Sequence, residues 1–189
     1  ASTHRESNQI IMMLGNQTCP RSSHEFLPLK ILESHLSYGM SSVLFRLFRE
    51  KNGLTYDVGV YNPIRQQNSP FLIYLSVSNK NAILAFKILI KLWKNLLTIL
   101  ISEEEINLAK VKLKSSFLIK NQTLEEILQR KLQLIGFDLD PDFDICCLRK
   151  IEEITSEDIL TVTNKFLSKP FLSIYGKKKL CKEINELWI

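Results

Sequence analysis

The chain has 189 residues, of which 45% are hydrophobic and 24% are charged. This balance is ordinary for a soluble globular protein, and the length is enough for one sizeable core, so we expect a single domain over residues 1–189. The formal net charge is +5, but the basic residues are scattered. The one obvious run, Lys177–Lys179, predicts a solvated turn rather than a nucleic-acid-binding surface.

The cysteine residues follow no spacing that marks a metal site. No two of them have the C-x-x-C arrangement, and two adjacent cysteines point in different directions from a helix or a strand. The four are Cys19, Cys146, Cys147 and Cys181. Unpatterned thiols favour a reducing intracellular compartment, cytoplasmic or organellar, or burial of the thiols. No secretory signal pattern opens the sequence, which does not by itself fix a destination.

The first third of the chain predicts a strand and a helix. After a polar lead, the apolar run Gln9–Leu14 ends at Gly15, which is typical of a central strand. Residues 25–36 carry apolar side chains at intervals of three and four and predict a helix. Pro28 falls in the first turn of this helix, where proline is tolerated.

Residues 39–61 predict a helix, a sharp turn and a strand. Apolar residues recur at helical spacing up to residue 48, and Gly53 can adopt the left-handed conformation that ends a helix. From Leu54 to Tyr61 the residues alternate between two faces, as in a strand. We therefore expect Arg49, in the last helical turn, to lie close to Tyr56 on the strand.

The middle of the chain predicts a hairpin and a long helix. A proline-containing turn joins the strand at residues 54–61 to a second strand, Phe71–Val77, and we expect the two to pair. Residues 82–101 match a membrane span in length. Three lysines on one helical stripe argue against a span, so we predict a helix that packs on the sheet. They are Lys87, Lys91 and Lys94.

Three capped helices are predicted in the second half of the chain. They begin at Ser102, Thr123 and Thr155, each followed by acidic residues that suit a helix N-terminus. The second of them carries an apolar stripe. The stripe consists of Ile127, Leu128, Leu132 and Ile135. A last strand is predicted at Phe171–Tyr175, followed by Gly176.

The acidic stretch between the second and third of these helices predicts a solvated loop. It covers residues 137–144 and includes Pro141. The stretch contains four aspartates, Asp138, Asp140, Asp142 and Asp144. They superficially suggest calcium binding, but the stretch lacks the glycine and the terminal glutamate of a calcium loop.

The order of these elements predicts the fold class. Strands near both ends, a hairpin in the middle and helices in two blocks indicate an α+β fold, with helices on one face of a mainly antiparallel sheet. An extended peptide could then add to an edge of this sheet as a further strand.

The segment from Gly39 to Val58 resembles the C-terminal, substrate-binding half of the insulinase and pitrilysin zinc metallopeptidases, which include the mitochondrial processing peptidases. Their pattern is roughly G-M-S-S-R-L-F-x-x-L-R-E-K-x-G-L-A-Y-x-V. The chain matches it at Gly39, Met40, Ser41, Ser42, Leu44, Phe45, Arg49, Glu50, Lys51, Gly53, Leu54, Tyr56 and Val58, and departs from it at Val43, Phe48 and Thr55. A weaker resemblance covers the helix and strand between Thr155 and Gly176.

The resemblance implies roles for Arg49 and Tyr56. In such peptidases these positions bind the substrate's backbone carbonyl across a cleft from the zinc-bound water. An arginine is a permanently charged donor and a tyrosine hydroxyl is a neutral one, so together they suit an oxyanion that develops during hydrolysis. The plainer alternative is that Arg49 interacts with the helix C-terminus and Tyr56 is a half-buried strand aromatic.

The zinc site itself is expected elsewhere. The resemblance implies an N-terminal half that carries H-x-x-E-H and a downstream glutamate, whereas none of His4, His24 and His35 has a second histidine four residues away. We therefore expect no metal site in this chain and no peptidase activity from it alone. The zinc-bearing half would lie in the same polypeptide or in a partner subunit, as a homodimer or a heterodimer, and the substrate would be a peptide.

Two other functions remain open at this point. One is a structural or assembly subunit of the same fold, like the non-proteolytic core subunits of the respiratory complex that resemble this family. The other is a basic binder of nucleic acid or of a membrane surface, which rests on charge alone and predicts steep loss of binding with added salt. We favour the peptidase half, without nucleic acid or membrane as a partner.

Overall fold

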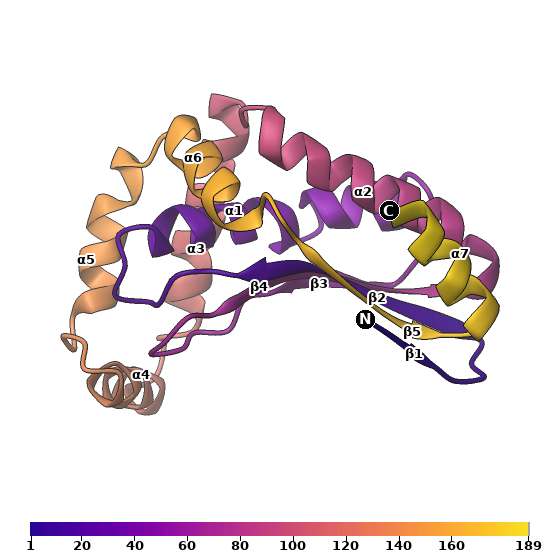
Figure 1. Ribbon diagram of the computed structural model, residues 1–189. Coiled ribbons are helices and arrows are strands. Elements are labelled where there is room, and N and C mark those ends of the chain that lie inside the picture. The colour runs from indigo at the N-terminus through magenta and orange to yellow at the C-terminus, as the bar shows by residue number, and fades with distance from the viewer. Residues whose placement is uncertain (189) are drawn as a thin grey trace.

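The computed structural model describes residues 1–188 and contains a five-stranded sheet with helices packed over one face (Figure 1). The strand order is β1-β5-β2-β4-β3. The bounds are β1 Ser2–His4, β2 Gln9–Gln17, β3 Asp57–Tyr61, β4 Pro70–Ser78 and β5 Phe171–Gly176. All pairs are antiparallel except β1 with β5, which is parallel. The α+β class is confirmed, and the sheet is mixed rather than purely antiparallel.

The helices follow the predicted order, with additions. Their bounds are α1 Phe26–Ser37, η1 Phe45–Glu50, η2 Asn79–Asn81, α2 Ala82–Thr98, α3 Glu103–Ile119, α4 Leu124–Gly136, α5 Phe143–Lys150, η3 Ile151–Glu153, α6 Ser156–Leu167 and α7 Lys178–Trp188. The hydroxyl of Ser102 accepts a hydrogen bond from the backbone N–H of Glu105, and Thr123 and Thr155 each open a capping box. The three predicted caps are therefore confirmed.

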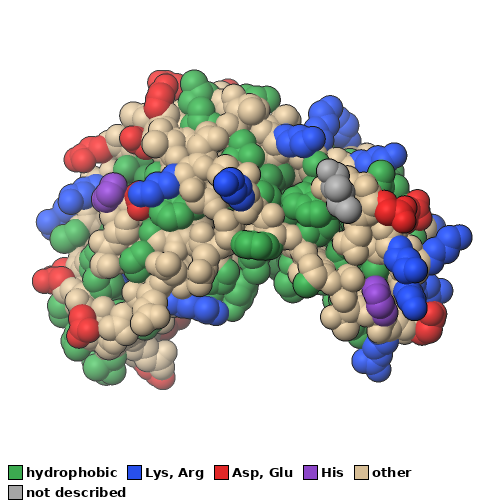
Figure 2. Space-filling model, in the orientation of Figure 1, with side chains coloured by type: hydrophobic (Ala, Val, Ile, Leu, Met, Phe, Trp, Pro, Cys, Tyr) green, Lys and Arg blue, Asp and Glu red, His purple; other side chains and the backbone are tan. Residues whose placement is uncertain are grey.

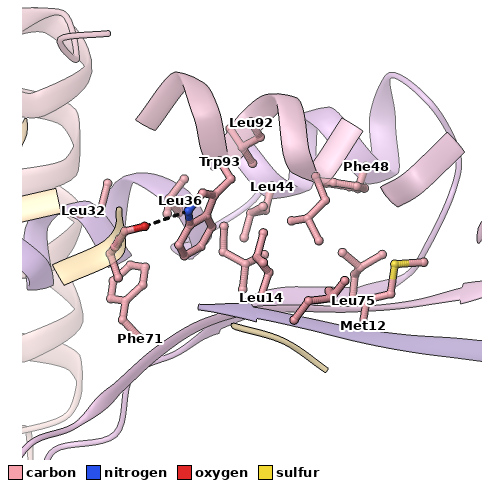
Figure 3. Close-up of a cluster of buried hydrophobic side chains, with 14 of the residues drawn as sticks. Met12, Leu14, Leu32, Leu36, Leu44, Phe48, Phe71, Leu75, Leu92 and Trp93 are labelled. Carbon is pink, nitrogen blue, oxygen red and sulfur yellow. Dashed lines mark hydrogen bonds between the residues drawn. The ribbon is translucent and has the colours of Figure 1, made fainter. Parts of the chain in front are cut away.

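The core lies between the sheet and the covering helices (Figure 3). Alternate residues of β2 and β4 point into it, because successive side chains of a strand face opposite sides. They are Ile10, Met12 and Leu14 on β2, and Phe71, Ile73, Leu75 and Val77 on β4. From α2, the indole N–H of Trp93 donates to the carbonyl oxygen of Leu167 at 3.1 Å, so the polar edge of this buried ring is satisfied.

Helix α2 packs on the sheet as predicted, through buried residues that include Ala85, Phe86 and Leu89. None of the helices in residues 1–188 is long and apolar enough to cross a membrane.

Three local predictions are wrong. Residues 137–144 are not all a solvated loop, because Asp144 lies in the first turn of α5 and is only 8% exposed. The lysine run is not a turn, because Lys178 begins α7. The strand expected from Leu54 begins instead at Asp57, and Leu54 and Thr55 are buried in the irregular segment that precedes it.

Helix α4 has an unexpected orientation. Its apolar side chains are mostly turned to solvent, and within the described chain only Leu134 of this helix is buried. The exposed set is Leu124, Leu128, Leu132 and Ile135. In Figure 1 the helix lies at the lower left, away from the layer that covers the sheet.

Within residues 1–188, no helix packs over the other face of the sheet, here called the bare face (Figure 1). It carries a cluster of apolar side chains that are largely exposed or half-buried. They are Met13 on β2, Tyr61 on β3, Leu72 and Tyr74 on β4, and Phe171 on β5. Figure 2 shows that the molecule is hollowed on this side. Tyr56 immediately precedes β3, the edge strand of this sheet.

Candidate functional site

The helix that carries Arg49 is a π-helix. Element η1 follows a short α-helical start at residues 43–44, and the backbone N–H of Lys51 donates to the carbonyl oxygen of Arg46, five residues back, at 2.9 Å. Leu44 and Phe48 are fully buried and point toward the sheet (Figure 3). Arg49, the next residue after Phe48, is exposed to solvent. Single π turns are rare and often occur at functional sites.

Gly53 makes the turn from this helix to the strand. Its φ of 56° is left-handed, a conformation that glycine adopts without strain. Its N–H donates to the carbonyl oxygen of Arg49 at 3.1 Å, and the N–H of Leu54 donates to that of Phe48 at 2.8 Å. These bonds satisfy carbonyl groups at the helix end and return the chain sharply toward the sheet.

Thr55 fixes the backbone beside Tyr56. Its hydroxyl donates to the carbonyl oxygen of Ser76 on β4 and accepts from the N–H of Asp57 at 3.0 Å. With Leu54 and Thr55 buried, Tyr56 is directed outward and its side chain is 89% exposed. The alternative in which Tyr56 is a half-buried strand aromatic is therefore wrong. In the sequence, Thr55 stands out only as a departure from the motif.

The structure brings Arg49 and Tyr56 together. The Cζ atom of Arg49 lies 5.1 Å from the centre of the Tyr56 ring and 4.8 Å from that of Phe45. Both distances are within the range of cation–π contacts, so two rings hold one guanidinium group. In the described part of the chain, no carboxylate forms a salt bridge with Arg49. Its donors are thus free to bind another acceptor.

Phe45 is the residue of this site that the sequence did not single out. It lies four residues before Arg49, a spacing that places two side chains on the same side of a helical surface. That spacing was the available signal. Phenylalanine at this position also belongs to the matched motif, where it had no assigned role.

The three histidines lie in β1, in the loop before α1 and within α1. Across residues 1–188, no group of three or more histidine, cysteine, aspartate or glutamate side chains is arranged to hold a metal ion.

Comparisons with known proteins identify the family. A sequence model described as "Peptidase M16 inactive domain" matches residues 2–113. A Rickettsia felis protein named "Uncharacterized zinc protease" is 30% identical over 169 residues, which cover 87% of this chain and 40% of that protein. The chain thus spans about two-fifths of this relative's length.

Solved structures show the same fold. A protease from Helicobacter pylori aligns with a TM-score of 0.81 at 18% identity, over 93% of this chain and 43% of the other. A peptidase M16 inactive domain from Pseudomonas fluorescens aligns with a TM-score of 0.76 at 22% identity, over 94% of this chain and 43% of the other. Together with the motif at residues 39–58, the comparisons confirm the resemblance to the non-zinc half of these peptidases. The chain belongs to the peptidase M16 inactive-domain family.

Proposed function

We propose that this chain forms one domain, the substrate-binding half of a two-part zinc peptidase whose metal, general base and nucleophilic water are held by a second half. Three facts support this assignment. The family is described as an inactive domain, a relative of more than twice the aligned length is named a zinc protease, and the chain contains no H-x-x-E-H motif. The chain alone would then bind peptides without cleaving them.

Arg49 and Tyr56 would bind the carbonyl oxygen of the scissile peptide bond. The main support is the guanidinium group of Arg49, which contacts two aromatic rings and forms no salt bridge with a carboxylate among the described residues. When the zinc-bound water attacks, negative charge develops on the carbonyl oxygen, and N–H and O–H donors aimed at it lower the barrier. Arg49 supplies charge, and Tyr56 supplies a neutral donor.

The surrounding backbone supports this role because donors stabilise a transition state best when they are already in position. The buried side chains of η1, the turn at Gly53 and the hydroxyl of Thr55 hold the backbone on either side of the two donors. The segment that carries both donors is therefore in place before a peptide arrives.

The substrate would lie along β3. Within residues 1–188 this strand pairs on one side only, with β4, so its outer edge can take an extended peptide through main-chain hydrogen bonds. Tyr56 immediately precedes the strand, which places the two donors at its beginning. The bare apolar face would contact alternate side chains of the bound peptide.

The test is a reconstitution. The chain is combined with its zinc-bearing half, and cleavage of an unstructured peptide is followed. We expect Arg49→Ala and Tyr56→Phe each to lower kcat by roughly a hundredfold to a thousandfold, the usual effect of losing one oxyanion donor. Association of the halves, measured by ultracentrifugation, should be unchanged.

Arg46→Ala is the matched control, since Arg46 lies on the same π-helix, is exposed and pairs with Glu105 at 3.9 Å instead of with the rings. If the two site variants turn over like Arg46→Ala, the assignment of Arg49 and Tyr56 is wrong. If no combination of halves cleaves any peptide, the non-proteolytic assembly role is the better explanation.

A further inference from the structure

A cavity of about 340 Å³ lies on the helical side of the molecule, apart from Arg49 and Tyr56. Residues of α1, α3, α4 and α5 line it, together with the loop between β3 and β4. These helices occupy the left half of Figure 1. The volume is at the lower end of the range for small-molecule sites, about 300 to 1,000 Å³. No side chain from residues 39–56 takes part in its wall.

The wall of this cavity carries an excess of positive charge. Four cationic side chains face only two carboxylates. The cations are Arg21, Lys30, Lys120 and Arg130, and the carboxylates are Glu33 and Asp144. Such an excess around a partly enclosed space favours an anion, because low-dielectric walls strengthen the field inside.

Arg21 and Arg130 share one carboxylate. Arg21 is only 2% exposed and its Nη2 atom pairs with Asp144, whose other oxygen accepts from the Nε atom of Arg130 at 2.6 Å. The Nε and Nη1 atoms of Arg21 are buried and have no hydrogen-bond partner within residues 1–188. Buried donors are normally satisfied, so this guanidinium group has room for a further acceptor. The single carboxylate of Asp144 also balances the charge of only one of the two arginines.

Glu33 cannot supply that counter-charge, because its neighbours already use it. It accepts from the Nζ atom of Lys30 at 2.6 Å, from the side-chain amide of Asn62 at 3.1 Å and from the hydroxyl of Tyr38 at 3.4 Å. Burial lowers the pKa of Lys30, Glu33 raises it, and the charges of Arg21 and Lys120 lower it further. The cations are therefore close enough to repel one another.

The uncharged part of the wall is mostly apolar, and its apolar side chains are Phe26, Leu27, Pro63, Ile64, Leu113, Phe117, Cys147 and Leu148. The uncharged polar residues are Tyr38, Asn62, Ser116 and Asn121. Lys120 is exposed, which places it at the rim. Apolar surface combined with charged and hydrogen-bonding groups that can orient a ligand is typical of a site for a small organic molecule. We propose that this cavity binds a small organic anion, a carboxylate or phosphate joined to an apolar group.

Titration calorimetry with three probes of similar shape tests this proposal. We expect naphthoate or naphthyl phosphate to bind saturably and the neutral naphthylmethanol to bind at least about tenfold more weakly, the worth of one charge-assisted hydrogen bond. Whichever anion binds more tightly identifies the head group. Equal affinity for the neutral probe, or no saturable binding of either anion, would overturn the proposal.

Three variants test whether the anions bind in this cavity. Lys120→Gln removes a rim charge and should weaken the anion by roughly tenfold. Ser116→Phe fills the cavity from α3 and should abolish binding. Lys91→Gln, an exposed lysine on α2, is the matched control and should bind like the parent. Circular dichroism checks that each variant is folded. If Lys120→Gln and Ser116→Phe both bind like Lys91→Gln, the site is elsewhere.

The proposal is independent of peptidase activity, since the isolated chain is sufficient for the measurement.

Discussion

A single hydroxyl group, that of Thr55, links the turn after the π-helix to the sheet. It bonds to the backbone of Asp57, two residues on, and of Ser76, across on β4. The first bond is local and typical of threonine in turns. The second joins residues 21 positions apart, which no local pattern reveals. The sequence could therefore place Arg49 near Tyr56 but could not say what directs Tyr56 outward.

Gly53 gives a prediction on the conformational cost of this turn. A β-carbon at Gly53 would meet no atom within 4 Å, so Gly53→Ala adds no clash. It does force an L-residue into the left-handed region, and we expect the free energy of unfolding to fall by about 1 kcal/mol. Urea denaturation measures the change.

Gly136→Ala is the matched control, since Gly136 also has open space around it but lies at the end of α4 without a positive φ. This variant should be neutral or slightly stabilising. A loss as large as that of Gly53→Ala would contradict the conformational explanation.

His35 gives a prediction on pH. Burial lowers the pKa of this α1 histidine, Glu105 raises it, and the charges of Lys112 and Arg46 lower it. The unfolded chain, with a pKa of about 6.5, then binds the proton more readily than the folded chain. Stability contributed by neutral His35 is present above about pH 6.5 and is lost as the pH falls toward the depressed value.

The measurement is urea denaturation between about pH 7 and pH 5.5. His35→Gln should flatten the fall in stability over this window, whereas the same change at the exposed His24 should leave the slope as it is in the parent. Equal slopes for the parent and His35→Gln would show that His35 does not contribute.

At the scale of secondary structure, the sequence predicts the presence and the end of helix η1 but not its type. The motif and Gly53 correctly predict a helix that ends before a strand. They do not distinguish a π-helix from an α-helix, because six residues hold too few turns for their spacing to differ. The wide turn matters for the site, since it determines the direction in which Arg49 leaves the helix relative to Phe45 and Tyr56.

Mutations in α4 can test which side of this amphipathic helix is buried. Leu128 and Leu132 are more than half exposed, whereas Leu134 is 1% exposed. We expect Leu134→Ala to cost about 2 to 5 kcal/mol, because it leaves a cavity. Leu128→Gln and Leu132→Gln should change stability by no more than about 0.5 kcal/mol.

Urea denaturation of the three α4 variants measures these differences. The reverse ranking would mean that the leucine stripe, and not Leu134, faces the protein. The capping box at Thr123 correctly predicted where this helix begins. Which side it buries depends on packing partners elsewhere in the chain, and these leave no local signal.

At the scale of the whole molecule, the sequence predicts the local pairings and misses the distant ones. The hairpin of β3 and β4 follows from two alternating segments around a proline-containing turn. The pairing of β1 with β5 and the ion pair of Arg21 with Asp144 each join segments more than a hundred residues apart. Three polar residues in β1 carry no strand signal, and Asp144 looked like one of four solvated aspartates. Their roles depend on partners that only the folded chain supplies.

The strand order also has a consequence for biosynthesis. In the sheet β5 lies between β1 and β2, yet it is the last strand in the sequence. As the nascent chain leaves the ribosome, β2 can pair with β4 early, but its other edge stays open and β1 has no neighbour until Gly176 has emerged. Open strand edges favour association with other chains, so chaperone binding during translation should be greatest before that point.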